Sequence, residues 1–179
     1  DLMAFHGVNP RTGSPTAVIG NNHFDAKVTQ TVDSDLSDPN QDVEAAIAMV
    51  QGTDNDVTGM IMSPGFRSAL AQQKDAQGLP MFPELAWGNA PSDINGLPVD
   101  VNRTVSDMSA DNALAYVGDF ANYFKWGYSR QIPLRVIEYG DPDNSGNDLQ
   151  GYNQVYIRAE VFLGWGILDP EAFARIRQQ

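Results

Sequence analysis

Short strand-like runs, each bounded by turn residues, fill the tract 113–176. Aromatic and β-branched residues in such runs suit a pleated, half-buried strand, and the Gly, Pro, Asn and Asp residues between them favour turns. The run 152–162 alternates best and predicts the clearest strand of the chain, whereas Asp169-Pro170-Glu171 predicts a final helical turn. The tract therefore limits the chain to a fold with many short strands joined by polar loops.

Two segments before this tract have the pattern of helices. Residues 42–51 place apolar side chains at i, i+4 and i+7 on one face, and Gly52 ends the segment. Ser63 supplies a capping hydroxyl, and Pro64 follows where a helix needs no amide hydrogen. Helices and strands in separate segments predict an α+β fold.

Charge and composition exclude several classes of protein. The formal net charge is −12, whereas a nucleic-acid groove needs a basic stripe, so we expect no specific nucleic-acid contact. The absence of cysteine excludes disulfides and thiolate metal sites. No apolar run approaches the roughly 20 residues of a membrane span, so no membrane contact is expected. The chain begins at Asp1 rather than at Met, and we expect a fragment of a longer protein.

One loop resembles a calcium-binding sequence. Asp141, Asp143 and Ser145 place oxygen ligands at alternate positions, and Gly146 follows at the position of the sharp turn. The twelfth position of such a loop should be a glutamate but is Tyr152, and no helix precedes the loop. A solvated loop between two strands is the expected structure. The alternative is a metal- or carbohydrate-binding β-rich module built on residues 140–151.

The sequence offers no set of residues for catalysis. His6 and His23 are the two histidines, and either could bind a metal with Asp25, although packed or exposed histidines are more common. Most acidic residues lie in turns and caps, and the sequence contains no Gly-x-Ser-x-Gly nucleophile elbow and no glycine-rich phosphate loop. We therefore expect no enzyme, no cofactor and no metal.

Large aromatic residues in glycine-rich segments are candidates for an interface. Trp87, Tyr123 and Trp126 either belong to an ordinary core or become buried between subunits, where aromatic residues are enriched. We expect these three residues to contact other subunits.

Several short motifs, taken in order, resemble the major capsid proteins of tailed bacteriophages, whose fold is named after phage Hong Kong 97. The motifs are the glycine-rich loop 7–20, the helix 42–51, the strand-then-helix element 57–64, the Lys-Asp-x-x-Gly turn at 74–78, the Gly-Leu-Pro-Val strand at 96–99, the Gly-Asp-Phe strand end at 118–120, and 152–160 followed by 168–173. Together they extend over nearly the whole chain.

The resemblance implies an α+β capsid fold that comprises the axial domain and the C-terminal part of the peripheral domain. Residues 1–20 would be the loop that leaves the peripheral domain, and 21–138 the axial domain. Residues 139–179 would be a connecting loop, the returning strand and the C-terminal part of the peripheral domain. The family's N-terminal arm, extended loop and spine helix would precede Asp1.

The same resemblance implies a structural function. The chain would be a major capsid subunit that assembles with its own copies, as pentamers and hexamers, into an icosahedral shell enclosing phage DNA. Other virion proteins are further potential partners. The protein would assemble in the bacterial host cytoplasm and reside in the virion. The alternative within this fold is an encapsulin, a bacterial nanocompartment shell protein.

The resemblance also points to a crosslink. Some members of the family join an asparagine and a glutamate of the returning strand to a lysine of a neighbouring subunit. Asn153 and Glu160 occupy positions that could correspond, and the lysine would lie outside this chain.

Overall fold

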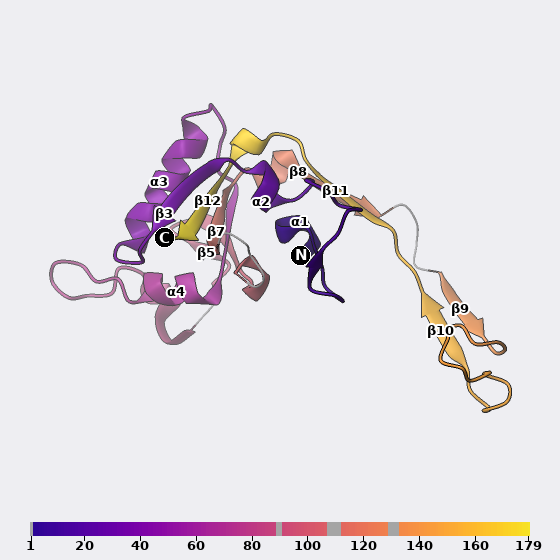
Figure 1. Cartoon of the computed structure of the whole chain (residues 1–179). Coiled ribbons are helices and arrows are strands. Elements are labelled where there is room, and N and C mark those ends of the chain that lie inside the picture. Colours follow the sequence, from indigo (N-terminus) through magenta and orange to yellow (C-terminus); the bar gives the residue numbers. More distant parts are fainter. Residues whose placement is uncertain (1, 89–90, 107–111, 129–132) are drawn as a thin grey trace. The chain divides into compact units, whose positions relative to one another are not determined.

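The computed structural model describes residues 2–88, 91–106, 112–128 and 133–179 (Figure 1). The chain divides into two compact units, Asp1–Lys125 with Gly166–Gln179 (unit 1) and Trp126–Trp165 (unit 2). The described helices are α1 (Leu2–His6), α2 (Phe24–Lys27), α3 (Pro39–Gln51), α4 (Pro64–Ala71), α5 (Phe120–Tyr123) and the 3₁₀ helices η1 (Pro83–Gly88), η2 (Arg103–Val105) and η3 (Pro170–Ala172). The described strands are β1 (Val8–Asn9), β2 (Ser14–Pro15), β3 (Gln30–Ser34), β4 (Gly59–Met62), β5 (Asp93–Ile94), β6 (Leu97–Val101), β7 (Ala113–Gly118), β8 (Phe124–Tyr128), β9 (Leu134–Ile137), β10 (Tyr156–Ala159), β11 (Leu163–Ile167) and β12 (Phe173–Gln178).

Unit 1 is built on a mixed sheet whose described strands follow the order β3-β12-β7-β4-β6-β5. β12 runs parallel to β3 and antiparallel to β7, with Ile176 opposite Val32 on one side and opposite Ala115 on the other. β4 runs antiparallel to β7 and parallel to β6. β7 therefore lies inside the sheet, and all six of its residues are buried.

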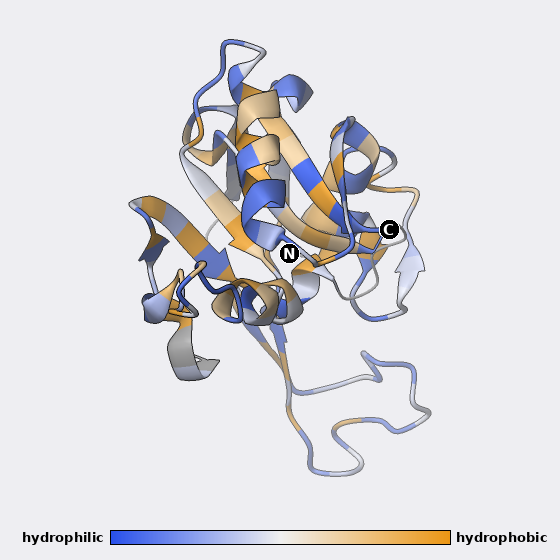
Figure 2. Cartoon of the chain, turned by 90° about the vertical axis from the view of Figure 1, so that its left-hand side faces the viewer, coloured by the Kyte–Doolittle hydropathy of each residue, from blue (hydrophilic) through white to orange (hydrophobic). Residues whose placement is uncertain are grey.

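The middle of the sheet of unit 1 is buried on both faces. On one face α3, α4 and η1 cover a core that includes Met60, Met62 and Ile176, and Figure 1 shows α3 beside β3. On the other face α1, α2 and η2 enclose a second core that includes Phe24 and Phe173. In Figure 2 the apolar orange segments gather on the strands, whereas the loops are mostly blue or white. Strands buried on both faces explain why apolar residues run almost without interruption through 113–118.

The two predicted helices are confirmed. α3 begins at Pro39, three residues before the predicted start, because Asp38 caps it: its carboxylate accepts a hydrogen bond from the Gln41 amide at 3.3 Å. In α4 the Ser63 hydroxyl accepts a hydrogen bond from the Phe66 amide at 3.2 Å. Each helix carries its start signal in the residues immediately before it.

Two predictions for the C-terminal tract are wrong in extent. The strand predicted over 152–162 is limited to β10, and all four of its side chains are exposed. The helical turn predicted at 169–171 is present as the short η3, but the prediction also placed Phe173 and Ile176 on one side of it, whereas both belong to β12. In β12 Ala174 and Ile176 face one core while Phe173 faces the other, which is the period of a strand.

Unit 2 centres on a two-stranded antiparallel ribbon, β9–β10, joined by the loop 138–155. β8 and β11 pair with each other and carry the chain between the two units. The predicted domain boundaries after residues 20 and 138 do not coincide with the limits of these units, and β12 is part of the sheet of unit 1. The assignment of axial and peripheral domains stays a prediction.

Candidate assembly surface

The three aromatic residues predicted at an interface differ in exposure. Trp87, at the end of η1 with a φ of 58°, is fully exposed. Trp126 in unit 2 is 64% exposed, and its ring meets Tyr128 edge to face with 5.5 Å between ring centroids. Tyr123 in unit 1 is half-buried against the core around Phe24. The structure therefore leaves Trp87 and Trp126 available for contact and uses Tyr123 partly for packing.

Sequence reasoning missed an apolar face on the β9–β10 ribbon. Residues directly opposite each other in an antiparallel pair point to the same side. Ile157 pairs with Val136, and Ala159 pairs with Leu134, so these four residues form one continuous side of the ribbon, named here the ribbon face. Leu134 is 72% exposed, and Ile157 is 67% exposed. The alternation within 134–137 and 156–159 was the available signal.

The other side of the ribbon is mixed in character. Arg158 lies directly opposite Arg135, and two like charges in this position repel. The Arg158 guanidinium donates a hydrogen bond to the carboxylate of Glu160, just after β10, which offsets part of this repulsion. The two sides of the ribbon therefore have different chemistry, and only the ribbon face is wholly apolar.

Unit 2 does not enclose a core of its own in its described residues. Leu149, in the loop 138–155, is the one buried apolar side chain among them. A two-stranded hairpin is marginally stable by itself in water, and an uncovered apolar side adds to this instability. The ribbon face is therefore suited to be covered by another surface.

The two predicted crosslink positions both lie outside regular strands. Asn153 is exposed in the loop before β10, with a φ of 52°, and its amide donates to the Gln150 carbonyl at 3.4 Å. Glu160 is half-buried, beyond the last residue of β10. Their role in a crosslink stays a prediction.

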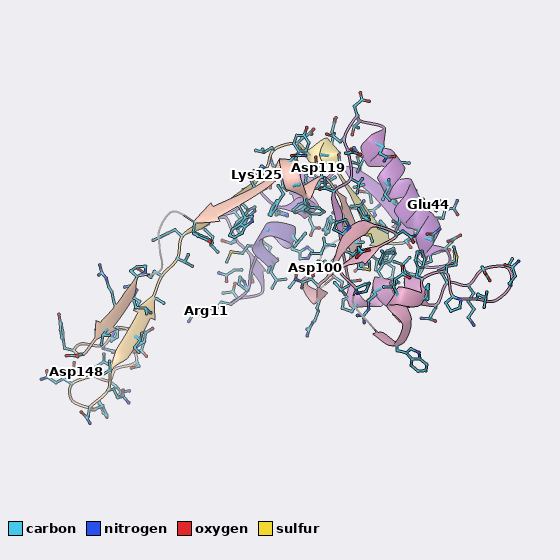
Figure 3. The ribbon with its side chains drawn as sticks, turned by 180° about the vertical axis from the view of Figure 1, so that it is seen from behind. Arg11, Glu44, Asp100, Asp119, Lys125 and Asp148 are labelled. Carbon is cyan, nitrogen blue, oxygen red and sulfur yellow. The ribbon has the colours of Figure 1, made fainter. Side chains whose placement is uncertain are left out.

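The carboxylates of the loop proposed for calcium close turns of the chain itself. Asp141 accepts hydrogen bonds from the amides of Gly146 at 2.7 Å and Ser145 at 2.9 Å, and these bonds lower the pKa of Asp141. Asp148, labelled in Figure 3, accepts from the amides of Gly140 and Gly151 at 3.0 and 3.1 Å. The described residues contain no group of three His, Cys, Asp or Glu side chains arranged to hold a metal ion.

His6 and Asp25, considered together as metal ligands, are instead bound to each other inside unit 1. His6 Nδ1 lies 2.6 Å from Asp25 Oδ2, and His6 Nε2 lies 2.7 Å from the carbonyl oxygen of Thr104. Both ring nitrogens are therefore occupied by protein atoms. His23 is half-buried, and its ring packs against Gly7 so closely that a Cβ at Gly7 would lie 2.6 Å from His23 Cδ2.

Asp25 is the centre of a buried polar cluster. Its Oδ1 accepts a hydrogen bond from the Tyr116 hydroxyl and lies 3.4 Å from Arg175 Nη1. Burial by itself would raise the pKa of Asp25, but the hydrogen bonds from His6 and Tyr116 outweigh it and lower the pKa. For His6, burial by itself would lower the pKa, but the hydrogen bond to Asp25 and the charge of that carboxylate outweigh burial and raise the pKa. Burial, with the neighbouring Asp25 charge, raises the pKa of Tyr116 well above its ordinary value.

Known proteins place the chain in a family. The model of the phage capsid family matches residues 13–177, and the chain belongs to that family. A solved structure from Mycobacterium phage Ogopogo is similar with a TM-score of 0.85 and 36% identity, and the match covers 99% of this chain and 62% of that chain. One from Gordonia phage Cozz has a TM-score of 0.82 and 28% identity, and the match covers 99% of this chain and 57% of that one. No curated protein matches the chain.

A more distant solved structure is titled as the capsid of an empty GTA particle, and it shares the fold with a TM-score of 0.55 and 19% identity over 79% of this chain and 44% of that chain. These relatives confirm the predicted α+β phage capsid fold. They do not favour the encapsulin or the metal- or carbohydrate-binding module. In the part of the chain that the structure describes, every helix is too short or too polar to span a membrane. The chain spans about 60% of the length of the phage proteins it matches.

Proposed function

We propose that this chain is the larger part of a major capsid protein whose copies build the icosahedral shell of a tailed phage around its DNA. The observation that carries this proposal is the match of the phage capsid family over residues 13–177. The similar GTA structure, titled as a particle capsid, supports assembly into a shell.

The proposed mechanism is association of subunits, without a chemical step. Heterologous contacts, in which different patches of two copies meet, close into rings when the rotation between copies permits, and pentamers and hexamers are such rings. The resulting particle would be the virion shell, assembled in the host cytoplasm. The exposed Trp87 and Trp126 support this mechanism, because large aromatic residues are enriched where protein surfaces meet.

We also propose a correspondence between the two compact units and the domains of the capsid fold. Unit 1, with its sheet covered on both faces, would be the axial domain, and unit 2 would belong to the peripheral domain. The lack of a core in the described part of unit 2 supports this division, because a ribbon of this kind needs support from a larger structure.

Electron microscopy of the full-length protein tests the proposed function. The expected result is uniform polyhedral particles. Ile157→Lys, which places a charge on the ribbon face, should lower the yield of particles, whereas Val18→Lys is the matched control because Val18 is 95% exposed in a loop of unit 1. A full-length protein that stays monomeric at high concentration would contradict the proposal. Equal particle yields from both variants would show that the ribbon face is not an assembly contact.

A further inference from the structure

The surroundings of His6 require a particular protonation state. Each ring nitrogen of His6 faces an oxygen that can only accept a hydrogen bond: Asp25 Oδ2 at 2.6 Å and the Thr104 carbonyl at 2.7 Å. A neutral imidazole carries one N–H, so one of these contacts would then set a nitrogen lone pair against an oxygen. The imidazolium, which has two N–H groups, satisfies both contacts. The geometry therefore indicates that His6 is charged in this fold.

The partners of His6 come from different parts of unit 1. His6 is the last residue of α1, Asp25 belongs to α2, and Thr104 belongs to η2. Asp25 is in turn bound to Tyr116 of β7 and Arg175 of β12. The imidazolium thus connects α1 to η2 directly and to the middle of the sheet through one carboxylate.

Apolar packing holds α1 in the same place. The ring of Phe5 stacks on Phe24 and on Tyr116, with centroids 5.1 and 5.3 Å apart. Phe5 is the one buried apolar side chain of this five-residue helix. α1 is too short to be stable alone, so its position depends on Phe5 and on the two hydrogen bonds of His6.

Because of the charges around His6, the loss of its proton should weaken only the contacts near α1. The titratable or charged groups of this cluster are Asp25, Tyr116 and Arg175, and His23 lies nearby against Gly7. When His6 is neutral, Asp25 still has Arg175 as its counterion and Tyr116 as a hydrogen-bond donor. The buried charge of Asp25 therefore stays paired inside the sheet. The hydrogen bonds that are weakened are those that join α1 to α2 and η2.

We propose that His6 is a proton-operated latch, which holds α1 on unit 1 while the imidazolium is present and loosens α1 when the ring becomes neutral. The latch is a property of unit 1 and does not depend on shell assembly. It makes the attachment of the segment before Phe24 sensitive to pH.

The direction of the pH effect follows from the shift of His6. Its pKa in the folded protein is raised, so the latch is fully present below the unfolded value of about 6.5 and is lost as the pH rises through the folded value. The pKa of Asp25 is lowered, so its contribution is present above about 3.9 and is lost as the pH falls through its folded value. The latch is therefore complete below about pH 6.5, down to the acid range in which Asp25 takes up a proton, and it is lost as the pH rises through the raised pKa of His6.

Hydrogen exchange and histidine NMR of the 179-residue chain test the latch. Between about pH 5.5 and pH 8.5, we expect the protection of the Gly7 amide, which bonds to the Met3 carbonyl, to fall several-fold after correction for the intrinsic rate. Amides of β7 should stay protected throughout. The ¹⁵N shifts of His6 should report an imidazolium at the lower pH and a neutral ring where protection falls.

Two variants separate the latch from general loosening. His6→Gln, whose side chain carries no titrating charge, should expose the Gly7 amide equally at both pH values, whereas His23→Gln should keep the pH dependence. A neutral His6 ring at the lower pH, with α1 still protected, would overturn the proposal, and so would unchanged Gly7 protection while His6 titrates. The NMR titration of the unaltered chain decides this even if His6→Gln fails to fold.

Discussion

Gly118, at the end of β7, lies where the backbone between η3 and β12 comes very close to β7. A Cβ built on Gly118 would press on the Ala172 carbonyl oxygen and lie 2.9 Å from Phe173 Cα. Both are backbone atoms of the β12 side of the ladder and cannot turn away as a flexible side chain can. Only a residue without a Cβ can occupy position 118 at this distance from the neighbouring backbone.

Gly118→Ala should therefore destabilise the chain by about 1–3 kcal/mol, the usual cost of overpacking a filled core. Chemical denaturation monitored by circular dichroism would measure this change. Gly166→Ala is the matched control, because a Cβ there would meet no atom within 4 Å. Equal free energies of unfolding for the two variants would contradict the explanation.

Asp119, the next residue and labelled in Figure 3, caps α5 and connects it to Thr58, the residue before β4. Its carboxylate accepts from the Asn122 amide at 3.1 Å and from the Thr58 hydroxyl at 3.0 Å. Asp119→Ala should cost about 0.5–2 kcal/mol, as the loss of a helix cap does. Asp56→Ala, at an exposed position, is the control and should change the free energy of unfolding little.

The cost of Asp119→Ala should also depend on pH. Burial alone would raise the pKa of Asp119, but the bonds from Asn122 and Thr58 outweigh it and lower the pKa. A carboxyl whose folded pKa is lowered stabilises the protein above its unfolded pKa and loses this effect as the pH falls through the folded value. The gap between the original chain and Asp119→Ala should therefore narrow in acid; a constant gap would mean that the ionised form is not what caps the helix.

At this scale, sequence reasoning predicted only what is local. The Gly-Asp-Phe motif at 118–120 was predicted as a strand end, and β7 does end at Gly118, but the short helix α5 that Asp119 caps was not predicted. The partners of His6 lie 19 and 98 residues away along the chain, and only the folded sheet brings them together. The same holds for the ribbon face, whose pairs depend on the register between two strands separated by a long loop.

Among the elements, α4 shows how a helix start can be tested. The Ser63 hydroxyl is buried and accepts from the Phe66 amide, while Pro64 occupies the first helical position. Ser63→Ala should lower the free energy of unfolding by about 1 kcal/mol, because it leaves a buried amide without a partner. Ser68→Ala, on the exposed side of the same helix, should be neutral or slightly stabilising in the same denaturation experiment.

Elements were predictable where their signals lie within a few residues. α3 and α4 carry a cap, a proline and an apolar stripe in one short segment, and both were predicted. The prediction of a strand over 152–162 was too long, because alternation shows that a strand can form but not where its hydrogen-bond partner ends. β9 has four residues, so the paired part of β10 also has four. Asp169-Pro170 does start a helical turn, which is η3. The residues after it form a strand because they pair with β3 and β7.

For the whole molecule, the net charge of −12 sets an expectation about contact with duplex DNA. Duplex DNA attracts proteins through basic side chains that displace counterions, and an acidic protein is repelled. The 179-residue chain should cause no shift of duplex DNA in a gel at low salt. Chemical amidation of the carboxylates removes the negative charge of the 23 Asp and Glu side chains and leaves the positive charge of the 11 Lys and Arg side chains, so the amidated chain should bind. Binding by the unmodified chain would contradict the expectation.

The position of β12 has a consequence for how the protein is made. This strand, at 173–178, lies between β3 at 30–34 and β7 at 113–118, so the sheet stays incomplete until residues 173–178 have left the ribosome. Contacts between residues so distant in sequence close large loops and slow folding. Until then β3 and β7 each present an unpaired edge, which is a site of aggregation. The sheet of unit 1 is therefore expected to close only after β12 has been synthesised, when a polysome already holds many identical unfinished copies side by side.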